Sequence, residues 1–347
     1  MLKEPEKILV VRTDRMGDVI LSTPVISALR RRYPHAYIAF MCRPYTRPLL
    51  EGNPGLNEVI ECDKSGSHKG FWGTVRFIRA LRRTRFDVAI ILHPTVRVHL
   101  VTFFAGIPRR IGWDKKNSFL LTRKIPHLKQ QGEKHESQYT LDILRALGIE
   151  TREIKPFVPV SEAARMNIAK RLQDKGIKVN EPFIVVHPSA SCPSKRWPQE
   201  HFVTLVNKIK TGLRLPVVLV TSRDEKEFGG KVAQVPEVID LRGALELSEL
   251  IALIEKAALF ISNDSGPVHI AASLDVPVIS IFGRSDPGLS PERWKPLGEH
   301  SVFVHKDVGC PVCFAHDCRK GFLCLESITP QEIFALVEKI LAKHKKI

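Results

Sequence analysis

The chain has 347 residues, of which 44% are hydrophobic and 26% charged, and its formal net charge is +16. This length allows two domains with a core each, and the composition excludes a disordered chain. The first residues lead into a strand without an apolar leader, and polar residues and Pro94 interrupt the most apolar window, 88–107. We expect no signal peptide and no membrane span. With seven cysteines, an odd number that fits a reducing compartment, we predict a cytoplasmic protein.

Positive charge is concentrated in the first part of the chain. Residues 1–155 hold 28 Lys or Arg against 15 Asp or Glu, whereas the remainder holds 25 against 22. A surplus confined to one part indicates a polyanionic partner, and the alternative is a basic solvated surface. Nucleic acid, an anionic membrane surface and a phosphorylated glycan all fit, but no nucleic-acid recognition motif accompanies the charge.

Strands and helices alternate along the chain, which predicts an α/β fold with parallel sheets covered by helices. In the first part we expect strands at 8–12, 37–41, 58–61 and 88–92, a short strand after 106–112, and helices at 24–32, 74–83 and 135–147. A polar, proline-containing linker is expected at 151–159. In the second part we expect strands at 183–187, 217–221, 237–240, 259–262 and 276–282, and helices at 163–175, from Pro198, after 266 and at 330–345. Two such units predict a cleft between them, with ligands at strand carboxyl ends.

The loop after the first strand carries candidate catalytic chemistry. Residues 12–18 contain one glycine, two acids and two arginines, and they lack the G-x-G-x-x-G spacing of a dinucleotide site. Asp18, directly after Gly17, is a candidate general base that projects into the cleft. The alternative is that Asp14 or Asp18 only caps the following helix.

A second loop, Asn263-Asp264-Ser265-Gly266, precedes a helix and follows a buried strand. An exposed helix N-terminus at this position favours anion binding, and Gly266 lets a ligand approach the backbone. Asp264 would repel phosphate unless it contacts hydroxyl or N–H groups. His269 on the first helical turn favours a functional reading over a plain capped helix.

The strand at 183–187 runs into a loop with Ser189, Lys195 and Arg196. Lys195 suits phosphate oxygens as a point charge, and Arg196 suits a phosphate or a carboxylate; the alternative is a solvated basic turn. After the next strand, Asp224 or Glu225 could accept hydrogen bonds from ribose hydroxyls, although acids also favour helix starts.

Four of the seven cysteines, Cys310, Cys313, Cys318 and Cys324, lie within fifteen residues. Four thiolates can close a tetrahedral zinc site. Only five residues separate the last two cysteines, which is short for a zinc ribbon. We therefore favour reduced structural thiols and predict no metal.

Taken in order, these segments resemble glycosyltransferase family 9, the heptosyltransferases of lipopolysaccharide core assembly. The matching pieces are 8–24 with Met16-Gly17-Asp18, 106–112, 187–198, 263–269, the cysteine-rich tail, and His135 ahead of 147–149. The resemblance implies a GT-B architecture, in which two Rossmann-like domains have parallel sheets facing across a cleft. It implies an acceptor domain at 1–155, a nucleotide-sugar domain at 156–329, and a C-terminal helix at 330–347 that packs back on the first domain.

The resemblance also implies a reaction and a set of site residues. The reaction is inverting transfer of heptose from ADP-L-glycero-D-manno-heptose to the lipopolysaccharide inner core, without a catalytic metal. Asp18 becomes the base, and Lys195 faces the diphosphate. The resemblance makes Lys195, Asp264, Ser265, Gly266 and His269 donor-binding residues, and loop position adds Ser189 and Glu225 to them.

Charge and loop position provide candidate acceptor contacts for an anionic, lipid-linked glycan. These candidates are Arg12, Arg15, Arg43, Arg109 and Arg110. We expect the protein to lie peripherally at the inner face of the inner membrane. The alternatives are a sugar-nucleotide epimerase or hydrolase of the same architecture, and a non-catalytic protein that binds nucleotide-sugar.

Overall fold

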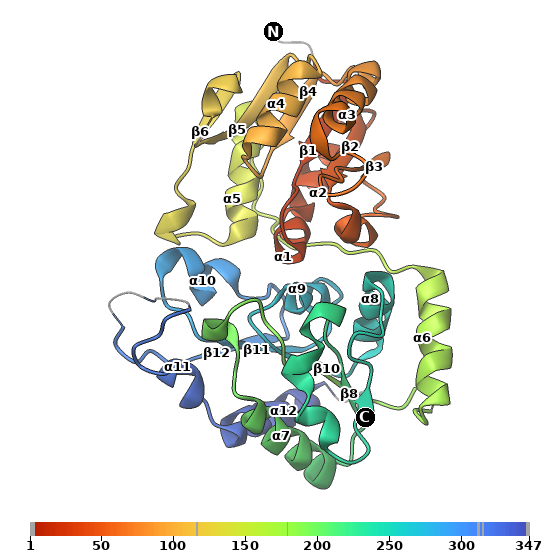
Figure 1. The fold of residues 1–347 in the computed structure, drawn as a ribbon, viewed down its shortest axis with the longest axis vertical. Helices are drawn as coiled ribbons and strands as arrows, with labels where there is room; N and C mark the ends of the chain where they lie inside the picture. Colours follow the sequence, from red (N-terminus) through yellow and green to blue (C-terminus); the bar gives the residue numbers. More distant parts are fainter. Residues whose placement is uncertain (1–3, 116, 179, 311–312, 314–315, 345–347) are drawn as a thin grey trace. The chain divides into compact units, whose positions relative to one another are not determined.

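The computed structural model describes residues 4–344 except 116, 179, 311, 312, 314 and 315. The chain divides into two units, one of Met1–Gln130 with Lys134–Pro159 and the other of Gln131–Glu133 with Val160–Ile347. The division after Pro159 falls at the end of the predicted linker, a few residues later than the expected boundary at 155. Each unit is a parallel sheet with helices packed against it (Figure 1).

The first unit is built on a six-stranded sheet whose paired strands are all parallel. Its strand order, β3-β2-β1-β4-β5-β6, changes direction between β1 and β4, and ligands of such sheets bind beside this point at the carboxyl ends of the strands. The strands are β1 (Lys7–Val11), β2 (Tyr37–Cys42), β3 (Glu58–Glu61), β4 (Val88–Ile91), β5 (Arg109–Asp114) and β6 (Arg123–Pro126).

The second unit repeats this plan with the order β12-β11-β10-β7-β8-β9, again parallel throughout. The change of direction lies between β7 and β10, whose buried aliphatic runs are typical of strands covered on both faces. The strands are β7 (Ile184–His187), β8 (Val217–Leu219), β9 (Ile239–Asp240), β10 (Leu259–Asn263), β11 (Val278–Phe282) and β12 (Ser301–His305).

The helices of the first unit cover its sheet and begin at its carboxyl edge. Phe77 and Leu81 of α3 and Val98 and Val101 of α4 share one core cluster with the strands. His135 caps α5, where its side chain accepts from Ser137 and the Gln138 side chain closes a capping box. The helices are α1 (Met16–Ile20), α2 (Thr23–Arg32), α3 (Gly70–Thr84), α4 (Val96–Phe104) and α5 (Glu136–Asp142).

In the second unit the last helix is part of the unit's own core. Ile333 and Val337 of α12 are fully buried in the same cluster as Phe202 of α7, and the indole N–H of Trp197 donates to the carbonyl of Ile328 at 2.8 Å. The apolar stripe of this helix lies in the core of the second unit, and the packing of the helix on the first domain remains a prediction. The helices are α6 (Glu162–Asp174), α7 (Gln199–Lys208), α8 (Leu247–Lys256), α9 (Gly266–Ser273), α10 (Pro291–Trp294), α11 (Leu323–Glu326) and α12 (Pro330–Lys343).

The predicted strands and helices are found within a few residues of their expected bounds, and the predicted end of the last helix, Lys345, lies outside the described residues. Among the helices and strands of the described residues, seven were not predicted, namely α1, α4, α8, α10, α11, β6 and β12. Strands β6 and β12 are sheet edges. An edge strand is covered less completely, so its sequence need not show a continuous apolar run. Within the described residues no helix is both long and apolar enough to cross a membrane.

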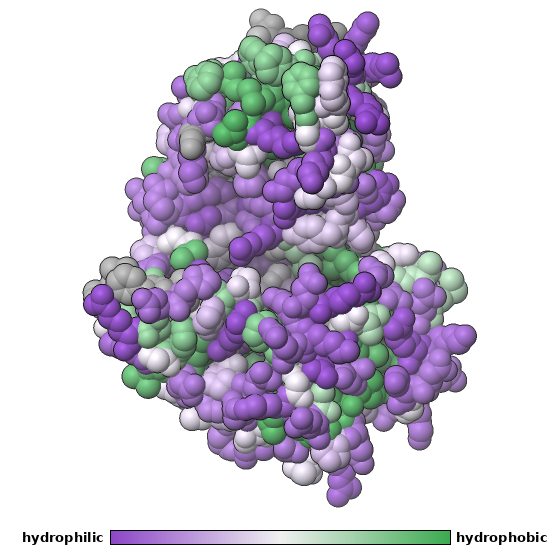
Figure 2. Space-filling model, in the orientation of Figure 1, coloured by the Kyte–Doolittle hydropathy of each residue, from purple (hydrophilic) through white to green (hydrophobic). Residues whose placement is uncertain are grey.

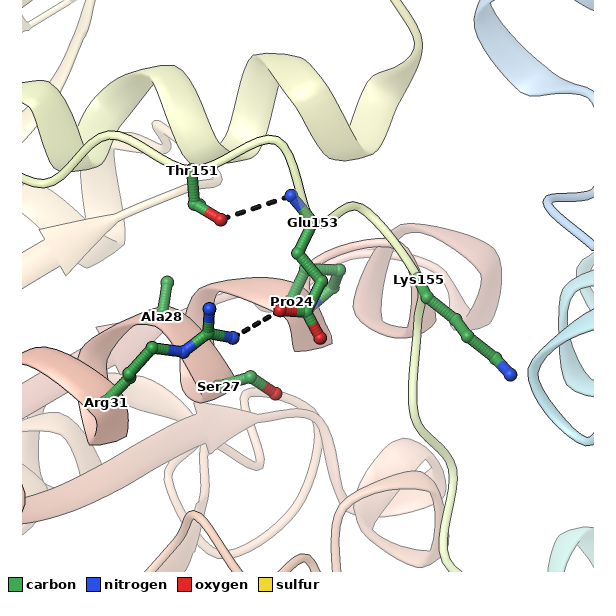
Figure 3. A pocket seen from close by; sticks show the side chains of 7 residues that line it. All are labelled: Pro24, Ser27, Ala28, Arg31, Thr151, Glu153 and Lys155. Carbon is green, nitrogen blue, oxygen red and sulfur yellow. Dashed lines mark hydrogen bonds and ion pairs between the residues drawn. The ribbon is translucent and has the colours of Figure 1, made fainter.

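A shallow depression of about 180 Å³, open to solvent, lies between α2 and the linker in the first unit (Figure 3). Arg31 of α2 forms an ion pair with Glu153 of the linker, and the Thr151 hydroxyl accepts from the Glu153 N–H at 3.1 Å. None of the predicted site residues lines this depression. Its contacts fasten the linker to α2 and form no ligand site.

Candidate functional site

In the first unit, Arg12 gathers three carboxylates at the carboxyl end of β1. Its Nε lies 2.9 Å from Asp14 Oδ1, its Nη2 pairs with Asp18, and its Nη1 lies 3.2 Å from Glu136 Oε1. Arg12 is 3% exposed, and each of its three guanidinium nitrogens contacts a carboxylate. Arg15 is the N-cap residue of α1, and no side chain caps this helix, so neither Asp14 nor Asp18 serves as the cap. We name Arg12, Asp14, Asp18, Glu136 and Lys129 the Arg12 cluster.

Glu136 and Lys129 complete the Arg12 cluster from a distant part of the chain. Glu136, in the first turn of α5, is 0% exposed and pairs with Lys129 as well as with Arg12. A buried charge is stable only when it is paired and hydrogen-bonded, so two cations here satisfy three acids. The sequence analysis missed both residues, since no local motif marks a Glu at a helix start as an active-site group.

The cluster shifts the proton affinities of its members. Burial raises the pKa of Asp18 above its ordinary value of 3.8, and the charges of Asp14 and Glu136 raise it further, while Arg12 and Lys129 oppose them. Burial alone would lower the pKa of Arg12, but the charges of Asp14, Asp18 and Glu136 together raise it. Arg12 therefore stays protonated, and Asp18 is a stronger base than an exposed aspartate.

His93 follows β4 and was also not predicted. Its Nδ1 lies 3.3 Å from the Thr13 hydroxyl. Burial, and after it the charge of Arg12, lower the pKa of His93 to about 4. The imidazole is therefore neutral at pH 7 and adds no charge beside the Arg12 cluster.

The predicted acceptor contacts fall at two different edges of the first sheet. Arg15 is exposed in the loop of Asp18, and Arg43 follows β2 at the same edge, with its guanidinium 5.7 Å from the Tyr45 ring. Arg109 and Arg110 begin β5 and pair in register with Val88 and Ala89, the first residues of β4.

Arg109 and Arg110 thus lie at the amino edge of the parallel sheet, away from Asp18. The guanidinium of Arg110 donates to the carbonyls of Ile107 and Leu120, the latter at 2.7 Å. The register of β5 places these two arginines a strand length away from the Asp18 loop. Their role as acceptor contacts remains a prediction, as it does for Arg15 and Arg43.

In the second unit, Lys195 and Asp264 meet at the carboxyl ends of β7 and β10. Lys195 Nζ lies 2.6 Å from Asp264 Oδ2 and 3.4 Å from the Asp264 carbonyl. Asp264 is 5% exposed, while the Lys195 side chain is 20% exposed. The lysine thus sits at the surface end of the pair, where it can reach an anion.

Hydrogen bonds link the side chains of five further residues at this edge. His187 Nε2 lies 3.0 Å from Ser189 Oγ, and the Ser189 hydroxyl donates to Glu225 at 3.0 Å. On its other side His187 Nδ1 lies 2.9 Å from Ser262 Oγ, which contacts Ser265 Oγ at 2.9 Å. Burial lowers the pKa of His187 to about 4, so the ring is neutral and bridges two hydroxyls. Glu225, and not the exposed Asp224, is one of these five residues.

The start of α9 has the features expected for an anion site. Ser265 is the N-cap residue, but its hydroxyl contacts Ser262 and no side chain caps the helix. The N–H of Gly266 can thus face an anionic ligand, whereas Pro267 has no N–H and the Val268 N–H donates to the Ser265 carbonyl at 3.3 Å. His269 lies on the first turn, 3% exposed. The structure therefore brings all seven predicted donor residues together at one edge of one sheet.

Two more residues that the sequence analysis missed hold the loops of this edge. Asn263 Oδ1 accepts from the Trp197 N–H at 3.0 Å, and its Nδ2 donates to the Pro188 carbonyl at 2.7 Å. Arg284, 9% exposed, donates to the Ser194 hydroxyl at 2.9 Å. Asn263 thus fixes both the Ser189 loop and the Lys195 loop.

The four cysteines of the tail are free thiols. Cys324 Sγ donates to the Gly283 carbonyl at 3.0 Å, and Cys318 Sγ accepts from the Phe322 N–H at 3.2 Å. Burial and then the neighbouring cysteines raise the pKa of the Cys324 thiol. In the part of the chain that the structure describes, which omits four residues within this tail, no three His, Cys, Asp or Glu side chains are arranged to hold a metal ion.

Comparison with known proteins supports the resemblance seen in the sequence. The family model described as "Glycosyltransferase family 9 (heptosyltransferase)" matches residues 74–323. The chain belongs to glycosyltransferase family 9. It is 28% identical over 354 residues to lipopolysaccharide heptosyltransferase 2 of Salmonella typhimurium, covering 97% of this chain and 99% of that one.

Solved structures agree with the family assignment. The chain resembles E. coli ADP-heptose lps heptosyltransferase II with a TM-score of 0.81 and 26% identity, over 98% of this chain and 99% of that one. It resembles the family 9 glycosyl transferase of Veillonella parvula with a TM-score of 0.83 and 23% identity, over 97% and 98%. The two parallel six-stranded sheets are those of the GT-B fold.

In this family 9 glycosyltransferase, Glu136→Gln tests the electrostatics of the Arg12 cluster. The charge of Glu136 raises the pKa of Asp18, so its removal should move the titration of the Asp18 carboxyl carbon, followed by ¹³C NMR, to lower pH. Glu133→Gln removes the same charge from an exposed position and should leave that titration unchanged. An Asp18 titration that is unmoved by Glu136→Gln would show that the two carboxyl groups are not coupled.

Proposed function

We propose that this chain is an inverting glycosyltransferase that moves heptose from ADP-L-glycero-D-manno-heptose to the inner core of lipopolysaccharide. The observation that carries this proposal is its likeness, over 97% of its length, to a protein named lipopolysaccharide heptosyltransferase 2. The arrangement of acid and base groups within each unit supports it. The rest of this proposal assigns a step to each group.

In the first unit, Asp18 is the general base. Its carboxylate takes the proton of an acceptor hydroxyl while the oxygen of that hydroxyl forms a bond to the anomeric carbon of the heptose. The bond between that carbon and the β-phosphate oxygen breaks, and ADP leaves from the opposite face with the electron pair. The raised pKa of Asp18 favours proton uptake, and its pairing with Arg12 supports the ionised form that the step needs.

In the second unit, Lys195 and the start of α9 stabilise the leaving ADP. The ammonium of Lys195 keeps its pair with Asp264 and turns its other N–H groups to the diphosphate oxygens, and the N–H of Gly266 meets the same charge. Glu225 accepts from the ribose hydroxyls, and the bond from Ser189 orients its carboxylate. Because a lysine and a helix N-terminus supply this stabilisation, our mechanism includes no metal cofactor and no role for the cysteine-rich tail.

The acceptor in this proposal is an anionic, lipid-linked glycan, and the protein acts peripherally at the inner face of the inner membrane. The excess of basic residues in 1–155 supports such a partner. Among the candidate arginines, Arg15 and Arg43 share the edge of Asp18 and are the contacts we favour.

Mass spectrometry of Kdo-lipid A oligosaccharide after incubation with ADP-heptose tests this function. A gain of one heptose per acceptor is expected, and donor alone should remain intact. Asp18→Asn should lower turnover about 10²- to 10⁴-fold, the usual contribution of a general base, and leave donor affinity unchanged. Asp14→Asn, in the same cluster and with the same 17% side-chain exposure, should cost far less. Hydrolysis or epimerisation of donor without acceptor, or near-normal turnover of Asp18→Asn, would contradict the proposal.

Lys195→Ala tests the donor site by isothermal titration calorimetry with ADP. Loss of a charge-assisted contact to the diphosphate should weaken binding about 10- to 100-fold, equivalent to roughly 1.5–3 kcal/mol. Lys231→Ala is the control, since Lys231 pairs with Glu200 at an exposed position of the same unit. Equal ADP affinity of wild type and Lys195→Ala would remove Lys195 from this role.

A further inference from the structure

The first unit exposes a group of large apolar side chains that its core does not use. Phe71 and Trp72, at the start of α3, are 72% and 74% exposed, and Phe119, in the turn Ser118–Leu120, is 75% exposed. We name the group the apolar patch. It consists of Phe71, Trp72, Leu100, Phe103, Phe104 and Phe119.

Helix α4 carries apolar side chains on both of its faces. Val98 and Val101 are buried in the core with His99 and Thr102, whereas Leu100, Phe103 and Phe104 are exposed. A helix that only covers a core normally has polar residues on the face turned to water. The exposed stripe of α4 therefore suits an apolar environment outside the protein.

The residues of the apolar patch lie on neighbouring elements. Helix α4 packs beside α3 and beside the turn that carries Phe119. Arg97 of α4 donates to the His68 carbonyl at 2.6 Å, just before α3, and the Arg110 guanidinium lies 5.3 Å from the Phe103 ring. Figure 2 shows apolar side chains gathered on the face of this unit that carries α4.

Positive charge surrounds the apolar patch. Residues 64–113 contain ten Lys or Arg and a single acid, Asp87. On α3, the exposed residues Arg76, Arg79 and Arg83 follow Trp72 at helical spacing, so one stripe passes from an aromatic ring to three guanidinium groups.

We propose that the apolar patch, with the basic stripe of α3, docks on the surface of an anionic phospholipid bilayer. Aromatic rings favour the headgroup level of a bilayer, and Lys and Arg are attracted to its acidic lipids. Helices α3 and α4 begin at the sheet edge that carries Asp18, so docking would hold this edge near a lipid-linked acceptor. Only the statement about the lipid-linked acceptor rests on the proposed function.

The same observations favour a bilayer over two other occupants. A second copy of the chain would place the basic stripe of one molecule close to that of its partner in a symmetric contact, where like charges repel. Nucleic acid would use the arginines, but Leu100, Phe103 and Phe104 offer it no hydrogen bond. An anionic bilayer can contact both the apolar side chains of the patch and the arginines of the basic stripe.

Co-sedimentation with vesicles tests the proposal, with no donor or acceptor present. The full chain should bind vesicles of phosphatidylcholine and phosphatidylglycerol at 3:1 more strongly than vesicles of pure phosphatidylcholine. In 1 M salt, its binding to the two kinds of vesicle should become equal. Trp72→Ser with Phe104→Ser should weaken partitioning at least about tenfold. Arg76→Glu with Arg79→Glu and Arg83→Glu should weaken it about 100-fold or more, since each cation contributes about fivefold.

Matched variants in other places control for composition and charge. Phe157→Ser with Met166→Ser removes exposed apolar side chains outside the patch, and Lys170→Glu with Lys175→Glu and Lys178→Glu reverses three exposed charges of the second unit. Both should bind vesicles as the wild type does. Equal binding by the patch variants and by their controls would overturn the proposal. The proposal would also be overturned if the patch instead mediated dimerisation, measured by ultracentrifugation, or binding to duplex DNA.

Transfer to a deacylated, water-soluble acceptor separates this proposal from the proposed function. Patch variants that fold should keep that transfer at the wild-type rate and lose transfer to acceptor embedded in vesicles. Vesicle binding with no transfer to any acceptor would contradict the function alone. Transfer to the soluble acceptor by a chain that does not bind vesicles would contradict the docking surface alone.

Discussion

The guanidinium of Arg12 is the interaction on which the first unit's chemistry depends. It pairs with Asp14, Asp18 and Glu136 at once, and it is almost completely buried. Removal of one partner from such a buried cluster would leave an uncompensated charge, so the charges fix one another's positions. As a result, Asp18 is held in one place and with a raised pKa at the carboxyl end of β1.

In the second unit, hydrogen bonds between neutral side chains hold the site residues in place. His187, kept neutral by burial, links Ser189 and Ser262, and through Ser189 it reaches Glu225. Besides Glu225, charge enters at Lys195 and Asp264, near the uncapped start of α9. The Lys195 ammonium has three N–H donors, so it can contact an anion that arrives and departs and still keep its pair with the buried Asp264 carboxylate.

The sequence predicted the parts of this protein that depend on local pattern. Buried apolar runs gave the inner strands, and Lys195, Asp264 and Ser265 were found because loops after such strands meet at one edge. Glu136 and Lys129 were missed because only the tertiary fold brings them to Arg12. Arg109 and Arg110 were chosen as acceptor contacts by charge and loop position, and neither of these reveals that the register of β5 places them at the opposite edge from Asp18. Helix α4 escaped prediction because its apolar residues lie on both faces.

The pH dependence of kcat/KM tests the central claim, that Asp18 within the Arg12 cluster acts as the ionised base. Activity should fall as the pH drops through a value above 3.8, because the pKa of Asp18 is raised and its protonated form is inactive. This acid limb should coincide with the NMR titration of the Asp18 carboxyl group, and both should move to lower pH together in Glu136→Gln. An acid limb that stays in place while the Asp18 titration moves would contradict the account.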